Sequence, residues 1–167
     1  ATGVVSTADV RPLVVLLHSY DTTYDWSRHV TRGLYAGLDS LQVAADTREE
    51  YLDVRRHQRR EHFPQMQDLL RAKYLATPPR LVVACDNAAV DFLRTHPDVF
   101  TGAPVVFGGV DDDDLLARLP RDRFTGLGEE FRLESLIDLA LQLRPQAQRV
   151  IVISDNSPAG RSHQAQL

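Results

Sequence analysis

The chain has 167 residues, of which 43% are hydrophobic and 25% are charged, and its formal net charge is −4. This composition is typical of a soluble globular protein, and its acidic balance argues against a general binder of nucleic acids or anionic membranes. The single cysteine, Cys85, excludes a disulfide or a cysteine-based zinc site within the chain. No apolar run in the sequence reaches the length of a membrane span.

The first half of the chain predicts two strands, each followed by a helix. An apolar run at 13–17 predicts a buried strand, and apolar residues at near-helical spacing predict a helix from about Asp25 onward. The region 43–52 alternates irregularly and carries charges, so it predicts an edge strand. A further helix is expected over roughly 60–76, where Thr77-Pro78-Pro79 ends it.

The second half continues the same alternation of strands and helices. A third strand is expected at 81–85 with a short helix after it, and a fourth strand at 104–107 ends in Gly108-Gly109, which is either a tight turn or a close approach to a ligand. An acidic loop or helical turn follows at 111–119, then a short extended crossing at 125–130. The last predicted elements are an apolar helix at 133–143 and a strand at 149–154. This alternation predicts an α/β fold, a parallel doubly wound sheet with helices on both faces.

Polar residues follow several of the expected strands directly. In open parallel sheets ligands bind beyond the carboxyl ends of the strands, so these residues are the candidate site. Each also has a structural interpretation: Asp86 and Asn87 as a helix N-cap, His18 as a semi-buried histidine, and Asp155 as part of a turn. The candidates are His18, Ser19 and Tyr20 after the first strand, Asp86 and Asn87 after the third, Gly108 after the fourth, Glu129 at the crossing and Asp155 after the last.

Motifs of catalysis and metal binding are missing from the sequence. It contains no G-x-G-x-x-G, no P-loop and no G-x-S-x-G nucleophile elbow. The four aspartates at 111–114 lack the spacing of a calcium loop and predict a solvated acidic turn, and the basic stretch 54–62 predicts a solvated surface. A receiver-like domain is disfavoured because the only lysine, Lys73, lies in a helical pattern. We therefore expect a binding module, not an enzyme, with neither cofactor nor metal.

Five blocks follow one another along the chain: VVLLHSYDTTYDWSRHVTRGL, EYLDVRR, LLRAKYLATPPRLVVACDNAAVDFL, APVVFGGVDD and TGLGEEFRLESLIDLALQLRPQAQRVIVISDNSPAG. Together they resemble the ABC-transporter substrate-binding-protein-like family, whose modules occur as transport receptors and as extracytoplasmic sensor regions. The resemblance implies a type I periplasmic-binding fold with two α/β lobes and a ligand cleft between them. Residues 1–125 would form the first lobe, and 126–167 would form the crossover and only the beginning of the second lobe.

The resemblance also implies a function and a site. The expected function is an extracytoplasmic, small-molecule-binding sensor module of a signal-transduction protein, such as a sensor histidine kinase. The alternatives are a solute-binding protein of an ABC transporter and a dimerisation domain without a small ligand. The ligand would be a small organic molecule, with amino-acid-like compounds as candidates, and the location periplasmic or extracytoplasmic. The implied cleft residues are His18, Ser19, Tyr20, Trp26, Asp86, Asn87, Phe107, Gly108, Glu129 and Asp155.

Partners other than the ligand follow from the apolar helix at 133–143. This helix needs a surface to pack on, so it is expected to cover the first lobe, to meet another chain, or to expose part of its face. A homodimer through the second-lobe elements is therefore one expectation. No nucleic-acid partner is expected, and any membrane attachment would come through flanking segments.

Overall fold

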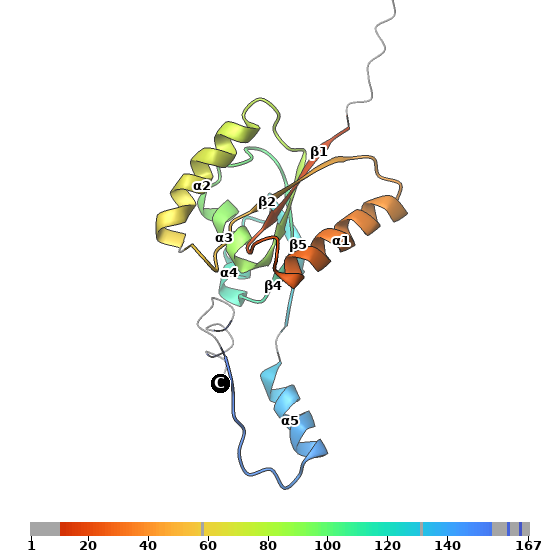
Figure 1. The fold of residues 1–167 in the computed structure, drawn as a ribbon, viewed down its shortest axis with the longest axis vertical. Coiled ribbons are helices and arrows are strands. Elements are labelled where there is room, and N and C mark those ends of the chain that lie inside the picture. The colour runs from red at the N-terminus through yellow and green to blue at the C-terminus, as the bar shows by residue number, and fades with distance from the viewer. Residues whose placement is uncertain (1–10, 58, 131, 155–159, 161–163, 165–167) are drawn as a thin grey trace, which may run out of the picture.

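The computed structural model describes residues 11–57, 59–130, 132–154, 160 and 164, and it confirms the predicted α/β fold. A five-stranded, all-parallel sheet lies at the centre with helices on both faces (Figure 1). The strands are β1 (Leu13–His18), β2 (Asp46–Tyr51), β3 (Leu81–Cys85), β4 (Val105–Val110) and β5 (Phe124–Gly128). The helices are α1 (Asp25–Ser40), α2 (Arg59–Tyr74), α3 (Asp86–Thr95), α4 (Asp113–Ala117) and α5 (Leu133–Leu143).

The strand order is β2-β1-β3-β4-β5, which places β2 at an edge as its charged sequence predicts. The chain crosses from β1 to β2 in one direction, and all later crossovers run in the opposite direction. Because crossovers between parallel strands are right-handed, α2, α3 and α4 lie on one face and α1 lies alone on the other (Figure 1). The direction changes between β1 and β3, and sheets of this order bind ligands at such a switch point.

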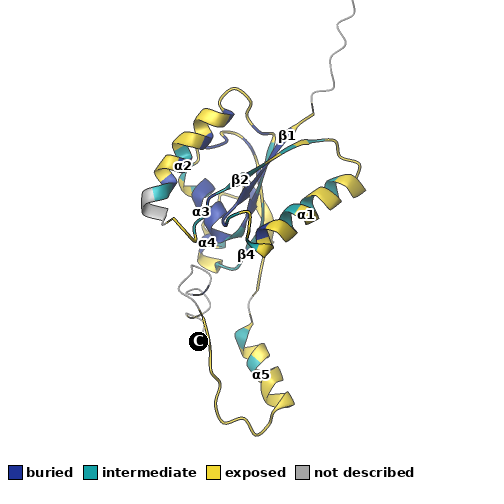
Figure 2. Ribbon diagram, in the orientation of Figure 1, coloured by how far each residue is buried: buried dark blue, intermediate teal, exposed yellow. Residues whose placement is uncertain are grey.

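The face beneath α2, α3 and α4, here called the covered face, contains the main core. Val82, Ala84 and Val105 point to this side and are fully buried together with Phe92 of α3 and Leu70 of α2. The dark-blue centre of the molecule in Figure 2 corresponds to these strands and to the inner side of α3. Burying such side chains stabilises the fold by roughly 1.5–3 kcal/mol each.

The opposite face, here called the open face, carries only α1. Beneath α1, Leu16 and His18 of β1 are buried. Farther along the same face, Val83 of β3 is only half-buried and Val106 of β4 is 37% exposed. One helix is therefore too little to cover this face.

Two expectations about strands are wrong. β4 does not end in a turn at Gly108-Gly109 but runs on to Val110, with a register shift against β5 between Phe107 and Val110. The irregularity needs the left-handed backbone of Gly109, whose φ is 72°. The strand expected at 149–154 is absent, and Ile153 in this stretch is 93% exposed. Four consecutive β-favouring residues form no strand where no neighbouring strand pairs with them.

α5 has the bounds that its sequence predicts, but it contributes nothing to the core. None of its residues is buried, and the helix lies beyond the carboxyl end of the sheet (Figures 1 and 2). In this chain Leu136, Leu139 and Leu143 of the helix are exposed. Within the described part of the chain, no helix has both the length and the apolar character needed to cross a membrane.

Candidate functional site

Tyr20 and Asp86 meet at the carboxyl ends of β1 and β3, on the two sides of the switch point. The Tyr20 hydroxyl donates to Oδ1 of Asp86 at 3.2 Å, and the same oxygen accepts the N–H of Asn87 at 2.8 Å. The backbone of Asp86 has a φ of 77°, a left-handed conformation that is uncommon for any residue but glycine. Such strained residues concentrate at functional sites, where the surrounding structure holds them in place.

Asp111 extends this cluster from β3 to β4. The side-chain amide of Asn87 donates to Oδ1 of Asp111, and the N–H of Asp111 donates to Oδ1 of Asn87 at 3.2 Å. Asn87 itself is buried, so this double hydrogen bond fixes the start of α3 to the end of β4. Glu129 follows β5, and its N–H donates to the carbonyl oxygen of Val110 at 2.6 Å. Three neighbouring strands thus bring the carboxylates of Asp86, Asp111 and Glu129 to one edge of the sheet.

The electrostatic environment of Asp86 disfavours its negative charge. Burial raises the pKa of the Asp86 carboxyl to about 6, and the charges of Asp111 and Glu129 act in the same direction against the hydrogen bonds from Asn87 and Tyr20. Burial and the Asp86 carboxylate likewise raise the pKa of Tyr20. A perturbed carboxyl group at a strand end is typical of a functional site. A positive charge placed beside Asp86 would stabilise its ionised form.

The Trp26 side chain lies on the β4 side of this edge. It stands in the first turn of α1 and is 37% exposed. Its ring lies against the backbone of Gly109, where a Cβ atom would come within 2.9 Å of the ring atom Cζ2. The glycine at 109 therefore allows a side chain of the same chain to approach the backbone closely. At Gly108, in contrast, a Cβ would meet nothing within 4 Å.

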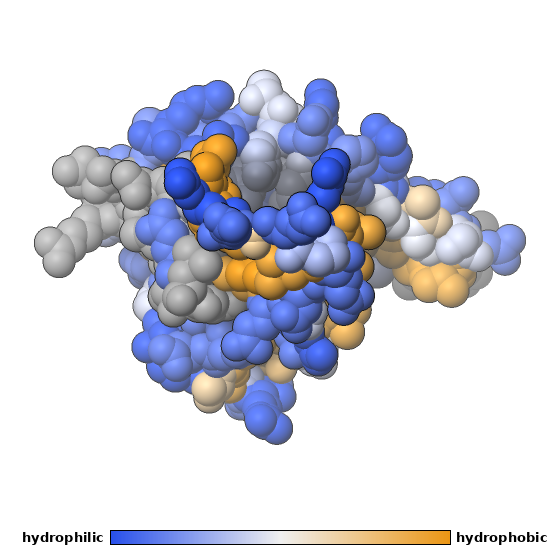
Figure 3. Space-filling view, turned by 90° about the horizontal axis from the view of Figure 1, so that it is seen from below, coloured by the Kyte–Doolittle hydropathy of each residue, from blue (hydrophilic) through white to orange (hydrophobic). Residues whose placement is uncertain are grey.

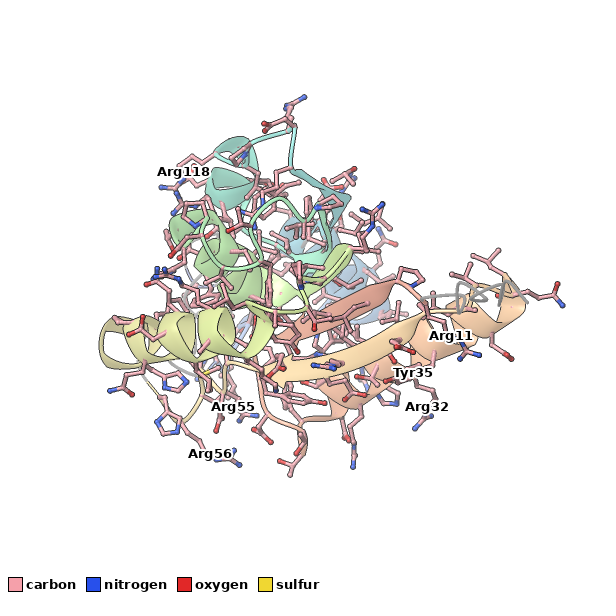
Figure 4. All side chains as sticks on the ribbon, turned by 90° about the horizontal axis from the view of Figure 1, so that it is seen from above. Arg11, Arg32, Tyr35, Arg55, Arg56 and Arg118 are labelled. Carbon is pink, nitrogen blue, oxygen red and sulfur yellow. The ribbon has the colours of Figure 1, made fainter. Side chains whose placement is uncertain are left out.

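A positive charge lies on the β2 side of the site. Tyr24 packs edge-on against Tyr20 with ring centroids 4.8 Å apart, and the Arg55 guanidinium lies 4.8 Å from the centroid of the Tyr24 ring. Arg55 belongs to the loop after β2, next to Arg56, which pairs with Asp21 at 3.4 Å. Figure 4 shows Arg55 and Arg56 close together in this loop. Arg55 therefore places a cation near β2, next to the ion pair of Arg56 with Asp21, whereas carboxylates follow β3, β4 and β5.

Ser19 has a structural role in the first turn of α3. Its hydroxyl donates to the carbonyl oxygen of Cys85 and accepts the N–H of Ala89, both at 2.8 Å. It thus stands between the two backbone groups that would otherwise bond to each other in that turn. The N-cap position is Cys85, so the interpretation of Asp86 as the N-cap is wrong.

Other predicted residues lie apart from the Tyr20–Asp86 cluster. His18 is buried beneath α1, where Nε2 is 2.9 Å from the Thr31 hydroxyl and the imidazole stacks on Tyr51, and burial lowers its pKa. Phe107 is half-buried and packs against the core of the covered face. Asp155 lies outside the described residues. The structure therefore brings together Tyr20, Trp26, Asp86, Asn87, Gly108 and Glu129 at the carboxyl edge.

Sequence reasoning missed Asp111, Tyr24 and Arg55. Asp111 was grouped with the acidic turn, and it becomes a strand-end residue only because β4 runs on to Val110. The turn interpretation is confirmed for Asp112, whose carboxylate accepts the N–H of Leu115 at 2.8 Å at the start of α4. Arg55 gave no distinct signal because it stands in a basic stretch typical of a solvated surface.

Among the described residues, no group of three or more histidine, cysteine, aspartate and glutamate side chains is arranged to hold a metal ion. Comparison of the chain with family models, curated proteins and solved structures finds no match.

Proposed function

We propose that this chain comprises the first lobe and the beginning of the second lobe of a small-molecule receptor of the periplasmic-binding type, which serves as the extracytoplasmic sensor module of a signal-transduction protein. The observation that carries the proposal is the hydrogen bond between Tyr20 and Asp86 across the switch point of the sheet. Open parallel sheets bind their ligands at this position. The resemblance of the five sequence blocks to substrate-binding proteins supplies the class of receptor.

The chemistry of the edge favours a small organic ligand with a protonated amino group. The carboxylates of Asp86, Asp111 and Glu129 supply negative charge, and the half-exposed Trp26 ring supplies a surface on which a cation or an apolar group can stack. Arg55 on the opposite side can pair with a ligand carboxylate. An amino-acid-like zwitterion matches this distribution of charge.

Signalling by such a module requires a conformational change coupled to binding. A second lobe closing over the carboxyl edge would surround the ligand, and closure would exclude water from the Asp86 carboxylate. Binding shifts the equilibrium towards closure only if the ligand has a higher affinity for the closed state than for the open state. The ordered contacts among Tyr20, Asp86, Asn87 and Asp111 provide a fixed surface on which the second lobe can close.

A titration with amino acids and biogenic amines tests the proposal. Trp26 is the only tryptophan of the chain, so its fluorescence reports directly on occupancy of the edge, and the melting temperature reports binding to the folded state. We expect a saturable fluorescence change and a higher melting temperature with at least one amine.

The matched variants for this titration are Asp86→Asn and Asp68→Asn. The first keeps the shape of the side chain and removes its charge, and we expect it to weaken binding roughly tenfold or more. The second removes a charge from an exposed position on α2 and should bind as the wild type does. Binding that is equal in both variants would place the ligand elsewhere, and a complete set of amines without any effect would contradict the proposed ligand class.

A further inference from the structure

α1 is weakly embedded in the molecule, although it carries Trp26 of the candidate site. Of its 16 residues only Ser27 is buried, whereas α3 has six buried residues among ten. Figure 2 shows α1 in yellow and teal, with dark blue only near its start, and seen from below the helix projects sideways from the body of the molecule (Figure 3). Gly33 and Gly37 also lower its intrinsic helical propensity. Segments with few buried contacts open more readily than the rest of a fold.

The contacts that attach α1 to the sheet are largely polar. Nε2 of His18 on β1 is 2.9 Å from the Thr31 hydroxyl on α1. The Tyr35 hydroxyl on α1 donates to Oε1 of Glu49 on β2 at 3.0 Å, and the Tyr51 hydroxyl donates to Oε2 of the same carboxylate. The imidazole of His18 stacks on the Tyr51 ring with centroids 4.9 Å apart, so it connects the two hydrogen-bonded groups. These five residues are here called the polar interface of α1.

Two buried polar atoms between α1 and the sheet have no hydrogen-bond partner within the described part of the chain. They are Nδ1 of His18 and Oγ of Ser27, and both residues are only 1% exposed. A buried polar atom without a partner disfavours the arrangement that buries it, because water would hydrogen-bond to the same atom if it were exposed. Detachment of α1 would therefore relieve both atoms, which reduces the free-energy difference between the attached and the detached helix.

The start of α1 connects the polar interface to the candidate site. Trp26 precedes Ser27 in the first turn of α1, and the Trp26 ring lies against the backbone of Gly109 on β4. Thr31 stands four residues after Ser27, so it lies on the same side of the helix, where it meets His18. Movement of this part of α1 away from His18 therefore also moves the Trp26 ring away from the carboxyl edge.

We propose that protonation of His18 releases α1 from the sheet and thereby withdraws Trp26 from the candidate site. A proton on Nδ1 would create a donor for which the described residues supply no acceptor, and it would bury a positive charge beneath α1. In the released state, water solvates the imidazolium. The release adds a pH control to the site of the proposed function, but its contacts exist without a ligand, so the two can be tested separately.

The groups around His18 determine the direction of the effect. Burial lowers the pKa of His18, and the Glu49 carboxylate on β2 acts against this shift without reversing it. The other groups that face it are uncharged at neutral pH: the Tyr51 phenol on β2, the Thr31 hydroxyl on α1 and the Cys85 thiol on β3, whose pKa burial raises to about 12. Because the pKa of buried His18 lies below the ordinary 6.5, attachment of α1 is strongest above pH 6.5 and weakens as the pH falls towards the pKa of the attached state.

Hydrogen exchange of the ligand-free chain at pH 7.5 and pH 5, corrected for the intrinsic exchange rate at each pH, tests the proposal. At pH 7.5 we expect the amides of α1 to be less protected than those of α3. At pH 5 the protection of α1 should fall about three- to thirtyfold further relative to α3. The upper value is the limit for a histidine of ordinary pKa that binds its proton only in the released state. Protection of α1 that is independent of pH overturns the proposal.

The matched variants for this experiment are His18→Gln and His29→Gln. Glutamine can still form a hydrogen bond with Thr31 but does not titrate, so the additional loss of α1 protection at pH 5 should disappear in His18→Gln. His29 lies on the exposed side of the same helix, so His29→Gln should behave as the wild type does. An equal pH response in both variants would assign the effect to another group and overturn the proposal.

Thr31→Val tests the same contact with His18 left in place. The variant keeps the shape of the side chain and removes the hydroxyl that meets His18, so the protection of α1 at pH 7.5 should fall by roughly two- to tenfold. Thr22→Val, in the exposed loop before α1, is its control and should leave the protection of α1 unchanged. Unchanged protection of α1 in Thr31→Val would contradict attachment through His18.

The fluorescence of Trp26 tests the connection to the candidate site. Asp86→Asn is the suitable background, because the carboxyl group at position 86 would otherwise titrate in the same pH range. In this variant the emission of Trp26 should change between pH 7.5 and pH 5 together with the loss of α1 protection. Emission that stays constant while α1 loses protection would contradict the withdrawal of Trp26.

Discussion

The two faces of the sheet are made from the same strands, yet they differ sharply in burial. In β4, Val105 is fully buried on the covered face, and its neighbour Val106 is 37% exposed on the open face. Both residues are valines in one apolar run, so local sequence does not distinguish them. The difference teaches that crossover direction, which places three helices on one side and one helix on the other, decides how much of each face is buried.

The same contrast exists at the carboxyl edge between Ser19 and Asp86. The Ser19 hydroxyl is buried and bonded to backbone groups on both sides, so it serves the fold. Asp86 has a strained backbone and a carboxyl group whose ionised form is disfavoured, so it reduces stability at neutral pH. A residue whose backbone strain and charge lower the stability of the folded protein is the better candidate for function.

The largest expected effect on stability distinguishes a substitution on the covered face from one on the open face. Val105→Ala removes buried methyl groups from the core and should lower the free energy of unfolding by about 2–3 kcal/mol. Val106→Ala should lower it by less than about 0.5 kcal/mol in dilute solution, as for most surface positions. Urea unfolding of both variants at low micromolar concentration measures the difference. Equal losses would show that the open face is covered in the monomer.

Ser19→Ala should lower the free energy of unfolding by about 2 kcal/mol. The variant leaves the N–H of Ala89 and the carbonyl of Cys85 without the hydroxyl that joins them, in a buried position. Thermal and urea unfolding measure this loss. Ser40→Ala, at the exposed end of α1, is the control, and a loss no larger than its own would argue against the structural role of Ser19.

Gly109→Ala should cost about 1–2 kcal/mol of stability and should move the ring of Trp26. The new Cβ would come within 2.9 Å of that ring, and alanine tolerates a φ of 72° poorly. The emission of the single tryptophan should therefore change together with stability. Gly33→Ala, where nothing lies within 4 Å, should leave the emission unchanged. An unaltered emission maximum in Gly109→Ala would contradict the contact between Trp26 and β4.

Asp86→Asn should have the smallest effect on stability, and in the opposite direction. The pKa of Asp86 in the folded state, about 6, lies above its ordinary value of 3.8, so the ionised carboxylate destabilises the folded protein above pH 6. The variant should therefore be more stable than the wild type by about 1 kcal/mol at pH 7.5, after allowance for partial exposure. This gain should shrink as the pH falls through 6 towards 5.

Unfolding curves of both proteins at pH 7.5 and pH 5 test whether Asp86→Asn raises the free energy of unfolding as expected. Asp68→Asn should show no comparable pH-dependent gain. A destabilised Asp86→Asn at pH 7.5 would mean that the carboxylate stabilises the fold. By the same linkage, an amine ligand that requires ionised Asp86 should bind about tenfold more weakly at pH 5 than at pH 7.5.

The local sequence pattern was sufficient to predict most strands and helices, but it was insufficient to predict where some of them end. β3 and α5 have the bounds that the sequence predicts, because an isolated apolar run and an uninterrupted helical period are local properties. The predicted end of β4 was wrong because two glycines usually mark a turn, whereas here the strand continues through an irregularity to Val110. The strand expected at 149–154 was wrong because strand formation depends on a pairing partner.

The sequence predicted where the candidate site lies but not which residues form it. A parallel sheet brings strand ends to one edge, which places Tyr20, Asp86 and Asn87 together from sequence order alone. Side-chain direction then separates residues that are neighbours in the chain. His18 turns beneath α1, Ser19 enters the first turn of α3, and Tyr20 reaches Asp86.

The sequence by itself determined the α/β class, the positions of most strands and helices, and the edge of the sheet on which polar residues gather. Those properties follow from periodicity and from residue types that act over a few positions. Only the tertiary structure decided that Asp111 joins Asn87, that Trp26 rests on Gly109 and that Val106 stays exposed beside the fully buried Val105. The physical reason is that contact, burial and pKa depend on which segments the crossovers bring together, and a linear pattern does not contain that information.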